Sequence, residues 1–124
     1  MSRVFKTGFF MRKTKKMDIS DVQLANAVQE MEKGLVDANL GSNVYKKRLS
    51  YSGRGKSGGS RTIVAAKEGS HWFFLYAFAK NDRDNITANE LSTFREAASA
   101  YLSLSDQEIE TLINLDKLLE VNMK

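Results

Sequence analysis

Apolar and polar residues follow two different periods along the chain, and the periods separate strands from helices. Residues 3–7 alternate and are rich in β-forming side chains, which predicts a short first strand. The spacing Ser20-x-x-Gln23 is a capping box, and the apolar residues after it fall on one helical face, so we expect a helix over about 21–33. Two similar boxes, at 87–90 and 105–108, predict two C-terminal helices, the last with Leu119 on its apolar face. Between the first strand and the first helix, we expect Phe9 and Phe10 to turn into the core.

Three further strand patterns lie between the first helix and the last two, at 44–49, 61–67 and 71–79. The run 71–79 is the most hydrophobic of the chain, which is typical of a central strand buried on both faces. A Glu-Gly-Ser hairpin turn at 68–70 and a glycine-rich segment at 53–61 connect the three strands, so they should form an antiparallel meander. The pattern therefore predicts an α+β fold: a small antiparallel sheet of the N-terminal strand and the meander, with helices packed on one face and two C-terminal helices.

Length and composition restrict the class of protein. A chain of 124 residues with 42% hydrophobic residues fits one folded domain, residues 1–124. It has no cysteine and one histidine, His71, so we expect no metal site and no cofactor. No apolar run approaches the roughly 20 residues of a membrane span, and basic residues from Arg12 onward follow Phe9-Phe10 too soon for a signal peptide. We expect a soluble cytoplasmic protein without a membrane partner.

The charge is unevenly distributed. Residues 1–83 contain 16 Lys/Arg and 7 Asp/Glu, whereas residues 84–124 contain 3 and 8, within a formal net charge of +4. A basic body with an acidic end indicates an anionic partner, most often nucleic acid. Ordinary scatter of charge over a solvated surface is the alternative.

Cations gather around the glycine-rich segment 53–61, which holds four of the eight glycines and no acidic residue. In a meander, the end of strand 44–49, the start of 61–67 and the end of 71–79 lie at one end of the sheet. These positions carry Lys46, Arg48, Lys56, Arg61 and Lys80. Such a cluster repels itself unless a polyanion binds it, so a phosphate-rich ligand is expected. Gly55-Lys56-Ser57 is not a P-loop, because Ser50 replaces the required first glycine and a strand follows.

Other candidate residues could have either a structural or a functional role. His71 could act as an acid or base, but it begins its strand at the opposite end from Lys80, which favours a structural role. Tyr76 and Phe78 share a face with Lys80 and could stack on bases, although core packing is the usual role of such a run. Asp82 and Asp84 could hold a metal, but among cations they more simply cap the next helix or form ion pairs.

Three strings together resemble a known family: 44–48 (VYKKR), 53–64 (GRGKSGGSRTIV) and 73–86 (FFLYAFAKNDRDNI). They are similar to the RelE/HigB superfamily of type II toxin–antitoxin toxins, most closely to its HigB-like branch. The resemblance implies a RelE-like fold and a ribosome-dependent mRNA endoribonuclease that inhibits translation. It also implies cleavage without a metal, by attack of the RNA 2′-hydroxyl on the adjacent phosphate. Lysine and arginine side chains suit this chemistry, since the protein need only position the RNA, move a proton and stabilise charge on phosphorus.

The resemblance also assigns roles by position. Arg61 would stabilise the phosphate, and Lys80 or Arg83 would be the second cation. The catalytic candidates are Arg61, Lys80, Lys56 and Arg83. The RNA-binding candidates are Lys46, Arg48, Arg54 and Phe78, with Lys56 also placed to grip RNA. One lysine could serve as base if cationic neighbours lower its pKa. The tyrosine or histidine that some relatives place near or after the last strand has no counterpart after Lys80, which leaves the general acid/base open.

The resemblance further implies partners: a cognate antitoxin, often with a helix-turn-helix domain, the ribosome and mRNA. DNA would be reached only through the antitoxin. The acidic C-terminal helix either completes the fold or contacts the antitoxin. Two other classes stay open: a non-catalytic RNA-binding or regulatory module, and an interaction protein whose basic loop meets an acidic partner.

Overall fold

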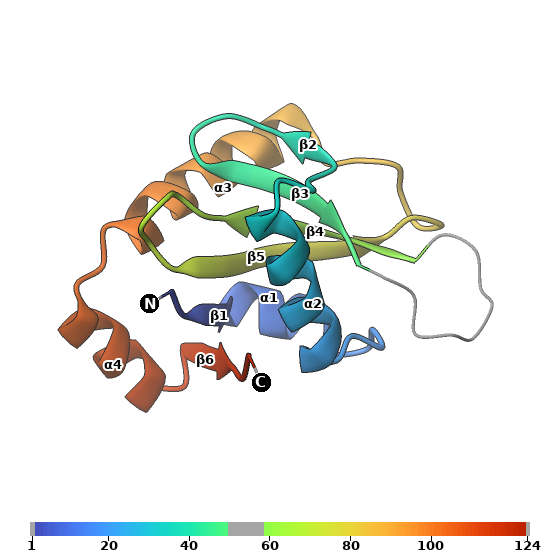
Figure 1. Ribbon diagram of the computed structural model, residues 1–124. Helices are drawn as coiled ribbons and strands as arrows, with labels where there is room; N and C mark the ends of the chain where they lie inside the picture. The colour runs from blue at the N-terminus through green and yellow to red at the C-terminus, as the bar shows by residue number, and fades with distance from the viewer. Residues whose placement is uncertain (1, 50–58, 124) are drawn as a thin grey trace.

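The computed structural model describes residues 2–49 and 59–123, and its centre is a six-stranded sheet (Figure 1). The strand order across the sheet is β2-β3-β4-β5-β1-β6. The strands are β1 (Val4–Thr7), β2 (Ala38–Asn39), β3 (Val44–Arg48), β4 (Ser60–Ala65), β5 (Trp72–Ala79) and β6 (Leu118–Val121). The α+β class and the antiparallel meander β3-β4-β5 predicted from sequence are confirmed. The first strand joins the sheet too, but parallel to β5.

Two strands were missed by the sequence pattern. β2 is two residues long and pairs with β3, too short to show a period. β6 was wrongly assigned to the apolar face of the last helix. The chain leaves that helix at Leu115, passes through Asp116 in the left-handed region (φ 59°), and returns as a strand antiparallel to β1. Leu119 is consequently 47% exposed on a strand instead of packed on a helix.

Four helices flank the sheet: α1 (Gly8–Lys13), α2 (Asp21–Glu32), α3 (Ala88–Leu102) and α4 (Asp106–Asn114). All three predicted capping boxes are formed, with Ser20, Thr87 and Ser105 as caps. The short helix α1 was not predicted, since its cap lacks the box: the Thr7 side chain accepts a hydrogen bond from the Phe10 backbone N–H at 3.2 Å.

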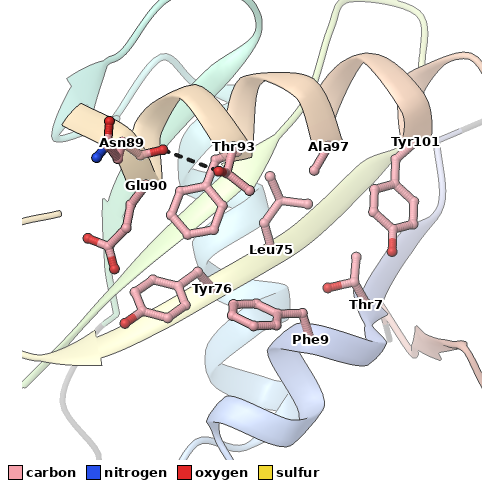
Figure 2. A pocket seen from close by; sticks show the side chains of 10 residues that line it. Thr7, Phe9, Leu75, Tyr76, Asn89, Glu90, Thr93, Ala97 and Tyr101 are labelled. Atoms are coloured by element: carbon pink, nitrogen blue, oxygen red, sulfur yellow. Dashed lines mark hydrogen bonds between the residues drawn. The ribbon is translucent and has the colours of Figure 1, made fainter. Parts of the chain in front are cut away.

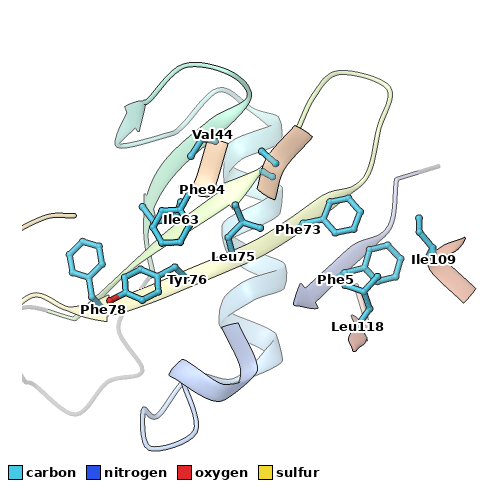
Figure 3. Close-up of a cluster of buried hydrophobic side chains, with 12 residues drawn as sticks. Phe5, Val44, Ile63, Phe73, Leu75, Tyr76, Phe78, Phe94, Ile109 and Leu118 are labelled. Atoms are coloured by element: carbon cyan, nitrogen blue, oxygen red, sulfur yellow. The ribbon is translucent and has the colours of Figure 1, made fainter. Parts of the chain in front are cut away.

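The helices cover both faces of the sheet, which corrects the expectation of one covered face. Neighbouring residues of one strand enter different cores: Phe5 packs with α3 and α4, and Val4 packs with α1 and α2. Figure 1 shows α2 crossing in front of the strands and α3 running behind them, and Figure 3 shows the core on the α3 side. A strand buried on both faces needs cover on both, as the run at β5 indicates.

The two phenylalanines of α1 have different surroundings. Phe10 is buried at 1% exposure, as expected, in the core beneath α2. Phe9 is 50% exposed, so the expectation that it also enters the core is wrong. The chain has already become helical here, and successive helical residues point about 100° apart. In the part of the chain that is described, no helix combines the length and apolar character needed to cross a bilayer.

Candidate functional site

The ends of β3, β4 and β5 meet at one end of the sheet, as the meander predicted. Arg48 lies directly opposite Arg61, and Arg61 lies opposite Phe78 on the next strand. Beyond the strands, the Lys80 N–H donates to the Gly59 carbonyl at 3.1 Å. The ladder therefore places Arg48, Arg61 and Lys80 on three adjacent chain segments at the same level.

The side chains of Lys46, Arg48 and Arg61 share the α3 face of the sheet. Strand residues two apart share a face, and Val44, at the start of the series, belongs to the core on the α3 side. Residues directly opposite on antiparallel strands have Cβ atoms roughly 5 Å apart, and like charges there are destabilising. The ladder thus brings the guanidinium groups of Arg48 and Arg61 to neighbouring positions on one face of the sheet.

Most of these cations also lack an internal counter-ion. Within residues 2–49 and 59–123, the side chains of Lys46, Arg48 and Lys80 form no ion pair and no hydrogen bond. The neighbouring acid Asp37 accepts a hydrogen bond from the backbone N–H of Arg48, not from its guanidinium. Arg48 and Lys80 are exposed to solvent. We call Lys46, Arg48, Arg61 and Lys80 the cationic end of the sheet.

Arg83, the other candidate cation, is held by Glu90 on α3. Its two terminal nitrogens donate to the Glu90 carboxylate at 3.0 and 2.6 Å, a bidentate pair. It also donates to the Tyr76 hydroxyl at 3.2 Å, and its guanidinium lies 5.8 Å from the ring centre of Phe78. The hydrogen bonds from Arg83 lower the pKa of Glu90 to about 2, and those to Glu90 raise the pKa of Arg83. Arg83 is therefore an anchored cation, with its charge partly offset.

Phe78 differs from its predicted role as an RNA contact. Its side chain is 1% exposed and its ring packs 6.2 Å from that of Tyr76. A ring with no exposed face cannot stack on a base, so the structure corrects this assignment. The predicted positions Lys56 and Arg54 lie outside the described residues.

His71 lies at the opposite end of β5, as expected. Its Nδ1 accepts the backbone N–H of Arg3 at 2.9 Å, and its Nε2 lies 3.7 Å from the Asp106 carboxylate. These contacts tie β5 to β1 and α4, which supports the structural role of His71.

The structure adds a group of residues on α1 that the sequence did not assign to the site. Phe9 stacks on Tyr76 with ring centres 5.8 Å apart and planes at 22°. Lys13 lies 5.4 Å from the centre of the Tyr76 ring, and Arg12 lies 5.8 Å from that of Phe9. The basic run from Arg12 to Lys16 was the one sign of these residues in the sequence. Because the helix α1 was not predicted, the sequence could not show that Arg12 and Lys13 lie over aromatic rings.

The chain matches a known protein family. Residues 2–121 match the family described as "RelE toxin of RelE / RelB toxin-antitoxin system". No curated protein matches the chain. The family match spans all six strands of the sheet and all four helices of the described residues. The chain belongs to the RelE toxin family of toxin–antitoxin systems.

Proposed function

We propose that this toxin is a ribosome-dependent mRNA endoribonuclease of the HigB-like branch that needs no metal. RelE toxins are generally mRNA-cleaving enzymes. The observation that carries the proposal is the Arg48–Arg61 pair, two like charges on directly opposite strand positions. A phosphate bound across them would accept charge-assisted hydrogen bonds from two guanidinium groups at once.

The proposed reaction uses the RNA as its own nucleophile. The 2′-hydroxyl loses its proton and attacks the adjacent phosphorus, forming the O2′–P bond. The P–O5′ bond then breaks, and the leaving oxygen takes up a proton. The products are a 2′,3′-cyclic phosphate and a 5′-hydroxyl end. Catalysis consists of alignment and of stabilising negative charge on the phosphate oxygens.

The cations divide between these tasks. Arg61, on a strand with paired neighbours on both sides, is rigid enough to meet the phosphate in the transition state. Lys80 is exposed just beyond β5, within the same cluster, and would act on the leaving group. Lys46 and Arg48 would grip the RNA backbone. Arg83, anchored by Glu90, would add a positioned charge. The predicted roles of Lys56 and Arg54 stay part of the proposal.

The partners follow from the family and this chemistry. RelE toxins pair with a cognate antitoxin. We propose that this antitoxin carries a helix-turn-helix domain, that DNA is contacted only through it, and that residues 1–124 act as one domain on mRNA at cytoplasmic ribosomes.

Primer extension on ribosome-bound mRNA tests the proposal. Wild-type protein should produce new 5′ ends in the presence of a metal chelator, and Arg61→Ala should slow cleavage about 100- to 1,000-fold, the loss expected for one transition-state donor. Lys80→Ala should also slow it. Lys33→Ala, an exposed cation just after α2, should cleave like wild type. RNA bound without cleavage would instead support the non-catalytic RNA-binding alternative.

A further inference from the structure

A pocket opens between α1, β5 and α3, beside the cationic end (Figure 2). Its volume is about 410 Å³, within the range of roughly 300–1,000 Å³ of small-molecule sites. The walls are mainly apolar, and Figure 2 shows Phe9 and Tyr76 side by side opposite Ala97 of α3. The predicted chemistry at the strand ends makes no use of this pocket.

The aromatic wall is unusual because half of the Phe9 side chain is exposed while its ring stacks on Tyr76. Phe9 gains little from the core in this position. An exposed aromatic face next to a hollow is what a planar ring needs for stacking, and such stacking tolerates every base.

Polar groups stand at the two ends of the pocket. Asn89 lies at one end and Tyr101 at the other (Figure 2). Among the described residues, neither the Asn89 amide nor the Tyr101 hydroxyl has a hydrogen-bond partner. Both can therefore meet the donor and acceptor groups on the rim of a ring.

The mouth of the pocket carries positive charge. Lys13 and Arg12 lie over the Tyr76 and Phe9 rings, and Arg83 donates to the Tyr76 hydroxyl. The one carboxylate among the lining residues, Glu90, is already bound by Arg83. An apolar peptide side chain gains nothing from such a rim, whereas a nucleotide brings a phosphate together with its ring.

The pocket also lies on the same face of the sheet as the proposed phosphate site, because its lining residues Tyr76 and Phe94 belong to the core on the α3 side. Tyr76 packs on Phe78, which lies opposite Arg61 in the ladder. We propose that this pocket binds a nucleobase of the RNA strand whose phosphate lies at the cationic end. This inference rests on the proposed function, and it names Phe9 as the stacking surface, with the buried Tyr76 ring supporting it from the core.

Pairing a protein change with a base change tests the proposal. Ribosome-bound mRNAs are made with a single abasic nucleotide at successive positions around the cleavage site, and cleavage is measured for wild type, Phe9→Ala and Ala97→Leu. At one position, removing the base should lower wild-type cleavage about 5- to 100-fold, as expected for one stacked base. Phe9→Ala removes the aromatic wall, and Ala97→Leu fills the pocket. Both variants should cleave intact RNA more slowly than wild type, and removing the base at that position should not slow them further. Leu119→Ala, a similarly exposed apolar residue on β6, should behave like wild type.

The outcomes separate the inference from the function beneath it. If wild type cleaves no RNA, the proposed function fails and the inference fails with it. If wild type cleaves but the pocket variants keep full sensitivity to every abasic site, only the inference is overturned. Weaker binding of the antitoxin by Phe9→Ala, with unchanged RNA cleavage, would assign the pocket to a protein side chain and overturn it as well.

Discussion

The two ends of the sheet differ in whether their cations have carboxylate partners. At the start of β5, Arg3 bridges two carboxylates, Glu110 at 3.0 Å and Glu120 at 2.8 Å. At the other end of the same strand, Lys46, Arg48 and Lys80 have no acidic partner among the described residues. At one end a cation is used in the fold's own ion pairs, and at the other these three cations are not.

The difference teaches how to separate structural cations from functional ones in this chain. The pairing holds the pKa of Glu120 below its usual range and that of Arg3 above it, because each stabilises the other's charged form. Arg3 joins β1 to α4 and β6, so its charge serves the fold. Arg48, which faces Arg61 across the strands, forms no ion pair and no side-chain hydrogen bond with the other described residues, so its charge is not used in this way.

Among the effects that compare the two ends of the sheet, the largest should appear in RNA binding. Arg48→Ala should weaken binding of single-stranded RNA several-fold at low salt, because it removes a cation that contacts phosphate. It should also make the dependence of log affinity on log salt shallower by about 0.7. Titration of a labelled oligoribonucleotide at several salt concentrations measures both quantities.

Arg3→Ala is the matched control for that titration, since it removes the same charge from the other end of the sheet. Its affinity and salt dependence should stay near those of wild type. Equal losses from the two variants would mean that net charge alone attracts RNA, and the contrast between the ends would lose its functional meaning.

The sequence correctly predicted where the ends of β3, β4 and β5 meet, because consecutive strands of a meander pair with each other. The three capping boxes, the meander and the position of His71 opposite Lys80 were all correct. The prediction failed where local pattern does not determine the outcome. The short helix α1 and the strand β6 are stabilised mainly by packing on the sheet.

The sequence pattern also did not predict which side chains from separate elements pair with each other. Arg83 and Glu90 are seven residues apart, and nothing in their spacing shows that one loop residue binds the first turn of α3. The sequence pattern also could not predict the exposure of each side chain. Phe9 and Phe10 are adjacent residues of the same type, yet Phe9 is half exposed and Phe10 is buried. The pocket beside Tyr76 depends on this difference.

Stability should respond to the same two cations with opposite signs. Arg3→Ala should lower the free energy of unfolding by about 0.5–1 kcal/mol, because a partly exposed ion-pair network is lost. Arg48→Ala should raise it by about 0.2–0.5 kcal/mol, because a like-charge pair across the strands disappears. Urea unfolding at low salt gives both values. A loss of stability in Arg48→Ala would show that its charge already has a partner in the free protein.

The smallest effect is the loss of stability at low pH. It should depend on the paired carboxylates and not on the cationic end. Glu90 has a pKa of about 2 against an ordinary 4.5, lowered chiefly by the hydrogen bonds from Arg83. A lowered folded-state pKa means that the stabilisation is complete above about pH 4.5 and is lost as the pH falls toward 2. Thermal unfolding between pH 6 and pH 2.5 should therefore show a steeper acid decline for wild type than for Glu90→Gln, which starts lower but has no charge to lose. Arg48→Ala should run parallel to wild type, because no carboxylate depends on it. If the stability of Glu90→Gln instead fell as steeply with pH as that of wild type, the charged Glu90–Arg83 pair would not be the source of the acid decline. Arg83 would then be grouped with Arg48 and Lys80 as a cation without an effective acidic partner.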